Sequence, residues 1–322
     1  MAEDVALPVP PPALPPIGRR RWLVHGAWLL ATFVTTTYVG GWHYVGFLSD
    51  FGQAPVSLTE ADPAFWMGGL WFSLSVLAIL GTHEAGHYLA CRHYGVDATP
   101  PLFLPAPLPL TGTFGAFIRI RDVIPHTRAL FDIGAAGPFA GFVVAVPVLA
   151  AGLAMSRLVP MPEHLEMISL GQPPLFRAVQ WALWGAVPPG QLLHLHPMAR
   201  AAWFGLLATS LNLFPLAQLD GGHIAYAAFG PRARWITIGT AVAVLALTFV
   251  SESWVAWAIL IAVVLAINGV SHPPTWDDAM PLGRARMLLV LAAAIVFLLC
   301  FTPSPVEPID DLVRSAPSAP RH

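Results

Sequence analysis

Long apolar runs without charge are the feature that most constrains the fold of this chain. The run FWMGGLWFSLSVLAIL at positions 65–80 contains no charged residue. Further apolar runs occupy about 22–48, 131–155, 200–229, 235–250, 254–270 and 286–302. Runs approaching roughly 20 residues are typical of membrane-spanning helices, and only 11% of all residues are charged. The pattern predicts an all-α polytopic membrane protein with about six to seven transmembrane helices.

The two ends of the chain differ in composition from the apolar part. Residues 1–21 are rich in proline and end in three arginines, and residues 304–322 are rich in proline, serine and aspartate. We expect both ends to be mobile tails. Between them we expect one membrane domain at 22–303, with its motif core at 65–229. Its first apolar run is longer than the roughly 7–15 apolar residues of a signal peptide, which indicates an uncleaved span.

The segment near residues 100–122 differs from the predicted spans in composition and in its pattern of apolar residues. Proline and glycine interrupt PPLFLPAPLPLTG, and the stretch from Phe114 to Ile120 then alternates as a strand does. Backbone groups that lie in lipid must find partners inside the protein. We therefore expect a membrane-dipping, β-hairpin-like segment there, packed against the helices.

The charged residues exclude one class of partner and predict an orientation. All 16 basic residues are arginine and the net charge is −2, so no basic patch for nucleic acid is expected. With seven spans and a cytoplasmic N-terminus, eleven of the 16 arginines fall on the cytoplasmic side, as the positive-inside rule requires. The two cysteines, Cys91 and Cys300, are interpreted as inert packing residues.

Two histidines and a glutamate follow the 65–80 run, in the sequence GTHEAGHYLA. His83 and His87 are four residues apart, so both imidazoles lie on one face of a helix and can bind one ion. Glu84 lies on the adjoining face, within reach of water held by that ion. This H-E-x-x-H arrangement is typical of zinc hydrolases, although the pattern alone also arises by chance. An acidic residue inside a spanning helix costs about 2.5–3.5 kcal/mol, which favours a functional role.

A catalytic zinc usually takes three protein ligands, so a third ligand is needed. The strongest candidate is Asp220 in SLNLFPLAQLDGGHI, residues 210–224, where an apolar segment ends and two glycines allow close approach of the backbone. His87 and Asp220 both fall toward the cytoplasmic side of the predicted topology, at similar depth. For His223, a role beside the ligands is the better interpretation than direct ligation. Gly137 and Gly141 are interpreted as a close helix contact.

The sequence resembles a known family at four places. HEAGH at 83–87 and NLFPLAQLDG at 212–221 resemble the paired HExxH and NxxPxxxxDG signatures of the site-2 protease family of intramembrane zinc metalloproteases. GAAGPFAG at 134–141 and SHPPTWDD at 271–278 are similar to its bacterial and plastid branch. For Asp277 and Asp278 in the last segment, a solvated loop is a better interpretation than a metal site.

The resemblance implies a reaction and the residues that perform it. One zinc per chain would be held by His83, His87 and Asp220. Glu84 would be the general base that activates a zinc-bound water, and Asn212 would position the substrate or stabilise the oxyanion. The domain at 22–303 would hydrolyse a peptide bond in or near a transmembrane helix of another membrane protein, as in regulated intramembrane proteolysis.

The resemblance also implies how the substrate is bound. The hairpin edge would add the substrate as an extra strand, with a purely structural re-entrant loop as the alternative. The residues that we expect to bind it are Gly112, Thr113, Phe114 and Gly115. The 156–199 connection is too short for the PDZ domain of many members, so no PDZ-mediated partner is expected. The expected partners are a transmembrane protein substrate and the lipid bilayer, in a membrane like the bacterial plasma membrane with the active site toward the cytoplasm.

Three alternative functions compete with this interpretation. A zinc transporter or metal-handling membrane protein would carry ionisable residues along a path across the bilayer, whereas here they cluster on two helices at one depth. Another kind of H-E-x-x-H membrane protease would take a glutamate as third ligand, but no glutamate after His87 lies in a predicted span. A catalytically inactive scaffold would not need both intact ligands and an intact base.

Overall fold

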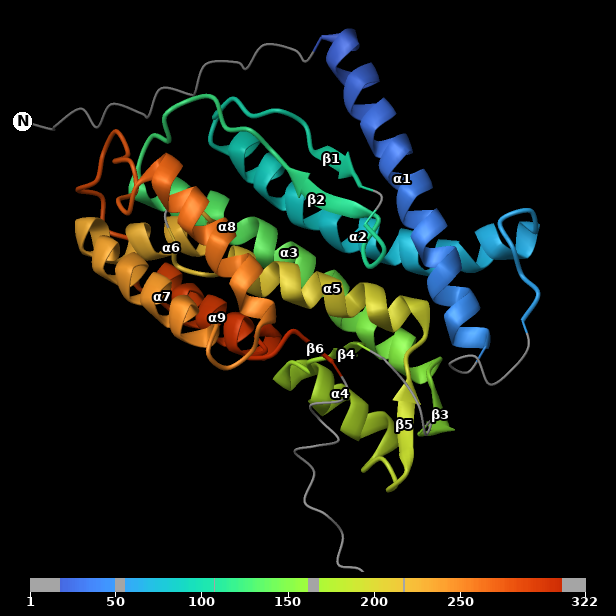
Figure 1. Cartoon of the computed structure of the whole chain (residues 1–322). Coiled ribbons are helices and arrows are strands. Elements are labelled where there is room, and N and C mark those ends of the chain that lie inside the picture. Colours follow the sequence, from blue (N-terminus) through green and yellow to red (C-terminus); the bar gives the residue numbers. More distant parts are fainter. Residues whose placement is uncertain (1–17, 50–55, 107, 162–167, 217, 309–322) are drawn as a thin grey trace, which may run out of the picture.

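Helices account for most of the computed structural model, which describes residues 18–49, 56–106, 108–161, 168–216 and 218–308 (Figure 1). The helices are α1 Arg19–Leu48, α2 Pro63–His93, α3 Thr127–Ala154, α4 Pro174–Trp184, α5 Pro197–Asn212, α6 Asp220–Phe229, the 3-10 turn η1 Gly230–Arg232, α7 Ala233–Leu247, α8 Ser253–Asn268 and α9 Arg284–Cys300. The strands are β1 Leu102–Pro105, β2 Thr113–Phe117, β3 Arg157–Pro160, β4 Ile168–Leu170, β5 Gln191–His194 and β6 Val306–Pro308. Most of both predicted tails lies outside the described residues.

Two helices in the described ranges are long and apolar enough to cross a membrane, α2 with 31 residues and α3 with 28. Both coincide with predicted spans. Helix α1 is continuous over 30 residues, but threonine, glycine and histidine interrupt its apolar sequence. Helices α7, α8 and α9 match the last three predicted runs but have 15, 16 and 17 residues. The predicted number of six to seven transmembrane helices is therefore not established and stays a prediction.

The predicted continuous span at 200–229 is wrong, because two helices occupy it. Helix α5 ends at Asn212 and α6 begins at Asp220. Pro215 lies in the break, where its missing N–H and its ring prevent α5 from continuing. A methyl group on Gly221 would overlap the carbonyl oxygen of Leu213, so only glycine lets α6 start so close to the end of α5. Asp220 thus begins a short helix instead of ending a long one.

The centre of the molecule is formed by α2, α3 and α5. Helix α3 packs against α2, α5 and α6. Large side chains from α3 and α5 fill the interior, including Phe131, Leu149, Trp203 and Leu206. In Figure 1, α7, α8 and α9 lie on one side of this centre, and α1 with the β1–β2 hairpin lies on the other. Helix α3 therefore links the helix that carries His83 to the helix that carries Asp220.

The predicted hairpin is present as an antiparallel pair of β1 and β2. Leu102 lies opposite Phe117, and an isolated bridge between Ala98 and Ile120 extends the pairing. In the part of the chain that the structure describes, β2 has no strand along its second edge. That free edge can accept another strand, and its insertion into a bilayer stays a prediction.

Helix α1 holds the hairpin at its turn. The His43 imidazole lies with Nε2 3.0 Å from the Leu110 carbonyl oxygen, and the Thr35 hydroxyl donates to the Gly112 carbonyl at 2.7 Å. Both contacts are at the turn between the strands, and β1 also packs along α1. Helix α1 therefore fixes the turn and the first strand of the hairpin.

The connection at 156–199 and the chain end form small sheets beside the helices. Strand β3 pairs with β5, and β4 pairs with β6, both antiparallel. Trp184 at the end of α4 donates from Nε1 to the Leu153 carbonyl at 2.9 Å, which holds α4 at the end of α3. Strand β6 falls within the segment predicted as the C-terminal tail, so ordered structure extends at least to residue 308.

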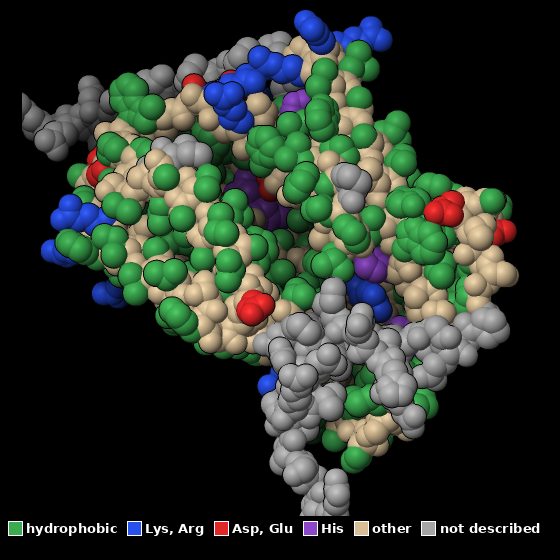
Figure 2. All heavy atoms as spheres, viewed as in Figure 1, with side chains coloured by type: hydrophobic (Ala, Val, Ile, Leu, Met, Phe, Trp, Pro, Cys, Tyr) green, Lys and Arg blue, Asp and Glu red, His purple; other side chains and the backbone are tan. Residues whose placement is uncertain are grey.

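Hydrophobic side chains are spread over much of the face shown in Figure 2, while arginines gather at its upper and left edges. Helix α1 exposes Trp22, Leu23, Trp28 and Leu30, among other large apolar side chains. Monomeric soluble proteins rarely expose continuous apolar patches of this extent. The surface therefore favours the predicted location in a membrane.

Candidate metal centre

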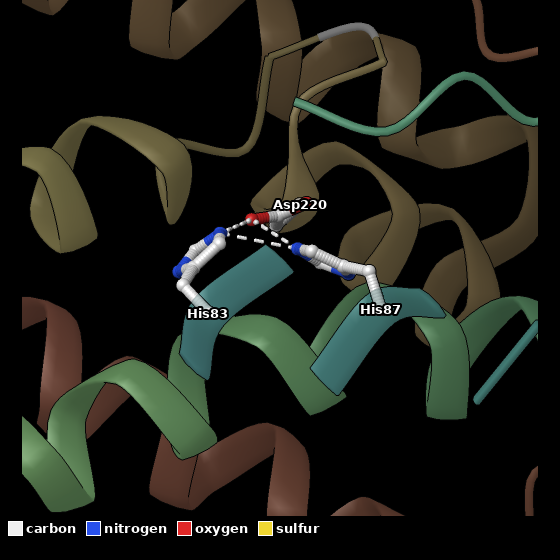
Figure 3. A group of neighbouring side chains, drawn as sticks. All are labelled: His83, His87 and Asp220. Atoms are coloured by element: carbon white, nitrogen blue, oxygen red, sulfur yellow. Dashed lines mark hydrogen bonds and ion pairs between the residues drawn. The ribbon is translucent and has the colours of Figure 1, made fainter. Parts of the chain in front are cut away.

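His83, His87 and Asp220 meet at one point between α2 and α6 (Figure 3). Asp220 Oδ2 lies 3.2 Å from Nε2 of His83 and 3.2 Å from Nε2 of His87. The two Nε2 atoms are 3.1 Å apart. The histidines are side by side because they are one helical turn apart on α2, and the start of α6 brings the carboxylate to them. The three predicted ligands therefore converge, and we call this group of three side chains the metal cluster.

The polarity of these atoms indicates that a cation belongs between them. The Nδ1 of His87 lies 2.7 Å from the Ile133 carbonyl oxygen, so Nδ1 carries the proton and Nε2 presents a lone pair to Asp220. Asp220 Oδ2 is a buried acceptor, and no hydrogen-bond donor from the described residues reaches it. Ligand atoms of a tetrahedral zinc with bonds of about 2.0–2.1 Å lie roughly 3.3 Å from each other. The observed separations of 3.1–3.2 Å fit that ion.

Glu84 and Asn212 lie beside this cluster. The Glu84 side chain comes from the same turn of α2 as His83 and is 6% exposed. Asn212 is the last residue of α5, and its Nδ2 lies 3.3 Å from His83 Nε2. An acid and an amide donor thus flank the metal cluster from two different helices. This arrangement has the groups that hydrolysis of an amide needs: a base, and a donor for a developing oxyanion.

The model of peptidase family M50 matches residues 71–251, which contain all five of these side chains. The chain belongs to peptidase family M50, the family of the site-2 proteases. No solved structure matches this chain. The M50 match covers both halves of the metal cluster and the hairpin between them.

Several curated relatives of this M50 chain are plant proteins named as probable zinc metalloproteases of the chloroplast. This chain is 33% identical to EGY1 of Arabidopsis thaliana over 239 residues, which cover 71% of this chain and 42% of EGY1. It is 28% identical to EGY2 of Oryza sativa subsp. indica over 255 residues, covering 75% and 45%. The chain thus spans less than half the length of these relatives.

A cavity of about 260 Å³ opens beside the metal cluster of the M50 chain, and Glu84, His83 and Asn212 line it. In Figure 2 a hollow in the visible face has histidine and acidic side chains at its bottom. Strand β2 forms one wall and α8 contributes another, with Trp257 and Ile261 among its lining residues. The wall from α8 was not predicted, because its apolar side chains do not differ in sequence from those of any lipid-facing helix.

The structure divides the four predicted substrate-binding residues into two pairs. Phe114 and Gly115 line the cavity, together with the neighbouring Ala116. The Gly112 carbonyl accepts from α1, and the Thr113 hydroxyl donates to the Leu104 carbonyl inside the hairpin at 2.7 Å. Phe114 and Gly115 are thus placed to meet a ligand, while Gly112 and Thr113 are placed to hold the hairpin.

His223 is not part of the metal cluster. It lies one turn beyond Asp220 on α6, and its Nδ1 is 2.6 Å from Nε2 of His272. The predicted role beside the ligands is compatible with this position. The SHPPTWDD segment that contains His272 lies between α8 and α9, and sequence reasoning had assigned it no contact with the site.

Proposed function

We propose that this chain is a zinc-dependent endopeptidase that hydrolyses a peptide bond in or near a transmembrane segment of another protein. The observation that carries the proposal is the cluster of His83, His87 and Asp220 beside a cavity that the free edge of β2 borders. Membership of family M50 and relatives named zinc metalloproteases support the same reaction. The zinc transporter would need further ligand groups along a path, and in the described residues this is the one convergent group of three.

In the proposed reaction, His83, His87 and Asp220 hold one zinc ion per chain. When bound, zinc supplies a Lewis acid that polarises a carbonyl and makes water more acidic. Glu84 takes the proton of the attacking water and passes it to the leaving nitrogen. Asn212 donates its amide N–H to the carbonyl oxygen as negative charge develops there. His83, Glu84 and His87 are buried, which limits their contact with bulk water and strengthens their interactions.

The substrate segment binds along β2 as an added strand. A peptide bond inside a helix is shielded by the helix hydrogen bonds, so the segment must become extended before it is cut. The free backbone edge of β2 offers hydrogen bonds to an extended chain, next to Phe114 and Gly115 in the cavity wall. A transmembrane protein is therefore the proposed partner, with the lipid bilayer as the surroundings. Relatives are named as chloroplastic, and a bacterial plasma membrane with a cytoplasmic active site stays a prediction for this chain.

The test uses the full chain purified in detergent, with wild type beside Glu84→Gln and Asp220→Ala. Zinc is counted by inductively coupled plasma mass spectrometry. Cleavage is followed by mass spectrometry on a set of synthetic single-span peptides that contain helix-breaking residues. We expect about one zinc per chain in wild type and in Glu84→Gln, and a large loss in Asp220→Ala. Cleavage should fall at least about 100-fold in Glu84→Gln.

The outcomes separate the proposal from its alternatives. Equal cleavage by wild type and Glu84→Gln would contradict the proposed reaction. Full zinc content in Asp220→Ala would show that Asp220 is not the third zinc ligand. Zinc flux into proteoliposomes that survives in Glu84→Gln, with no peptide cut, would favour the transporter.

A further inference from the structure

The loop between α8 and α9 contacts α6, the helix that begins with Asp220. His272 in this loop places Nε2 2.6 Å from Nδ1 of His223. His223 lies three residues after Asp220 on α6, so the two share one side of the helix. The loop therefore contacts α6 about one turn after the proposed metal ligand.

A second contact lies about one helical turn further along α6. The Tyr226 hydroxyl donates to Asp278 Oδ2 at 2.8 Å, and the Tyr226 ring stacks on His272 with centroids 4.7 Å apart. Asp278 is itself fixed, because the Thr275 hydroxyl donates to its Oδ1 at 2.7 Å. Burial raises the pKa of Asp278, but these hydrogen bonds outweigh that effect and hold the pKa below its ordinary value. The acceptor is therefore a carboxylate. The contacts at His223 and Tyr226 together fix the rotation of α6 about its axis and its position along that axis.

The other side of the loop is joined to the start of α3. The Asp277 backbone N–H donates to the Pro125 carbonyl at 3.2 Å, and the Thr127 N–H donates to the Asp277 carbonyl at 3.3 Å. The Arg128 side chain donates from Nε to the Pro281 carbonyl at 2.9 Å. Helix α3 also supplies the Ile133 carbonyl that orients His87. The loop thus ties α6 to the helix that fixes a ligand from α2.

The protonation of the histidine pair makes its contact directional. His272 Nδ1 lies 2.5 Å from the Pro273 carbonyl oxygen, so Nδ1 carries a proton. Burial lowers the pKa of His272, which keeps the ring neutral and leaves a lone pair on Nε2. His223 Nδ1–H therefore donates to His272 Nε2. Position 272 needs a hydrogen-bond acceptor at this point.

Helix α6 needs such support because it has only ten residues, and helices below roughly 12–15 residues are marginal by themselves. We propose that the 271–278 loop is a clamp that positions Asp220 at the metal, with His272 and Asp278 as its positioning residues. This inference rests on the proposed zinc site and adds the part of the fold that holds its third ligand in place. Without the clamp α6 can rotate, and the carboxylate leaves the two histidines.

The test measures metal binding and does not depend on cleavage. Full-length His272→Ala, His272→Gln, Tyr226→Phe and Trp276→Ala are compared with wild type for the rate at which a chelator removes zinc, and for the visible absorption of the cobalt(II)-substituted protein. We expect about 10–100-fold faster zinc release in His272→Ala, with a changed cobalt spectrum. His272→Gln keeps an acceptor and should remain within about threefold of wild type. Trp276 is 79% exposed on the same loop, so Trp276→Ala is the matched control.

Tyr226→Phe removes one oxygen atom and keeps the test valid if His272→Ala fails to fold. Faster zinc release in Tyr226→Phe supports the clamp. Wild-type release and cobalt spectra in folded His272→Ala or in Tyr226→Phe would overturn it. A wild type that binds no zinc would contradict the proposed function itself, which separates that failure from failure of the clamp alone.

Discussion

The backbone of Gly137 on α3 lies against the imidazole of His87 on α2, so closely that no side chain fits between them. Gly141, one turn later, packs less tightly against His83, whose Cβ would be 3.1 Å from an added methyl group. The predicted close helix contact is therefore confirmed. Its partners are the two histidines of the metal cluster, so α3 supports both rings from behind.

Gly137→Ala is expected to displace the His87 ring. Zinc affinity should fall about 10–100-fold, as is usual when the surroundings of a metal ligand are disturbed. The rate at which a chelator removes zinc from the purified protein measures this effect. Gly239→Ala on α7 is the matched control, because an added methyl there meets no atom of the described residues within 4 Å. Unchanged zinc release in Gly137→Ala would contradict the contact.

Arg286 joins α9 to α3 through a two-point ion pair. Its Nε and NH2 lie 2.9 and 2.7 Å from the two carboxylate oxygens of Asp132, and the Tyr94 hydroxyl donates to the same carboxylate. Arg286→Met should lower the free energy of unfolding by about 1–2 kcal/mol, because a partly buried carboxylate loses two charge-assisted hydrogen bonds. Thermal unfolding in detergent measures the loss. Arg284→Met, which changes an exposed arginine of the same turn, should have a much smaller effect, and equal losses would refute the assignment.

His43 connects the hairpin turn to Arg200, which is partly buried. Its Nε2 lies 3.0 Å from the Leu110 carbonyl oxygen and its Nδ1 lies 3.4 Å from NH1 of Arg200. Nδ1 therefore accepts from the guanidinium and Nε2 donates to the turn. His43→Leu should speed hydrogen exchange of the amides at 108–113 about fivefold, which corresponds to one hydrogen bond of roughly 1 kcal/mol.

Hydrogen–deuterium exchange with mass spectrometry resolves this hairpin segment. His25→Leu is a suitable comparison, because His25 Nδ1 contacts the Pro101 carbonyl at 3.1 Å, at the other end of the hairpin. Its effect should appear near residues 101–103 and not at the turn. An identical exchange pattern for both variants would show that His43 does not hold the turn.

The two cysteines should not react in the folded protein. Cys91 and Cys300 are free thiols with no exposed surface, which agrees with the interpretation that they are packing residues. A maleimide reagent should label neither thiol in detergent and both after denaturation, as counted by intact-protein mass spectrometry. Fast labelling of the folded chain at either position would mean that its helix opens on the time scale of the reaction.

Local spacing in the sequence was sufficient to identify most of the candidate site. His83, Glu84 and His87 share one helix, and helical periodicity alone places their side chains on adjoining faces. The alternation from Phe114 to Ile120 likewise predicted the hairpin, because side-chain direction in a strand follows sequence position. Asp220 was identified as a carboxylate at a break in an apolar run. Its chemistry was readable, but its distance from the histidines was not.

The tertiary structure decided what depends on contacts between distant segments. It broke the predicted span at Pro215 and made Asp220 the first residue of α6. It turned Phe114 and Gly115 toward the cavity, while α1 held Gly112. It also brought His272 to His223, across a separation that no local pattern encodes. Sequence alone determined which groups could bind a metal, because that is a property of side chains. Packing of α3 and the 271–278 loop decided where those groups meet, because it depends on the approach of whole helices.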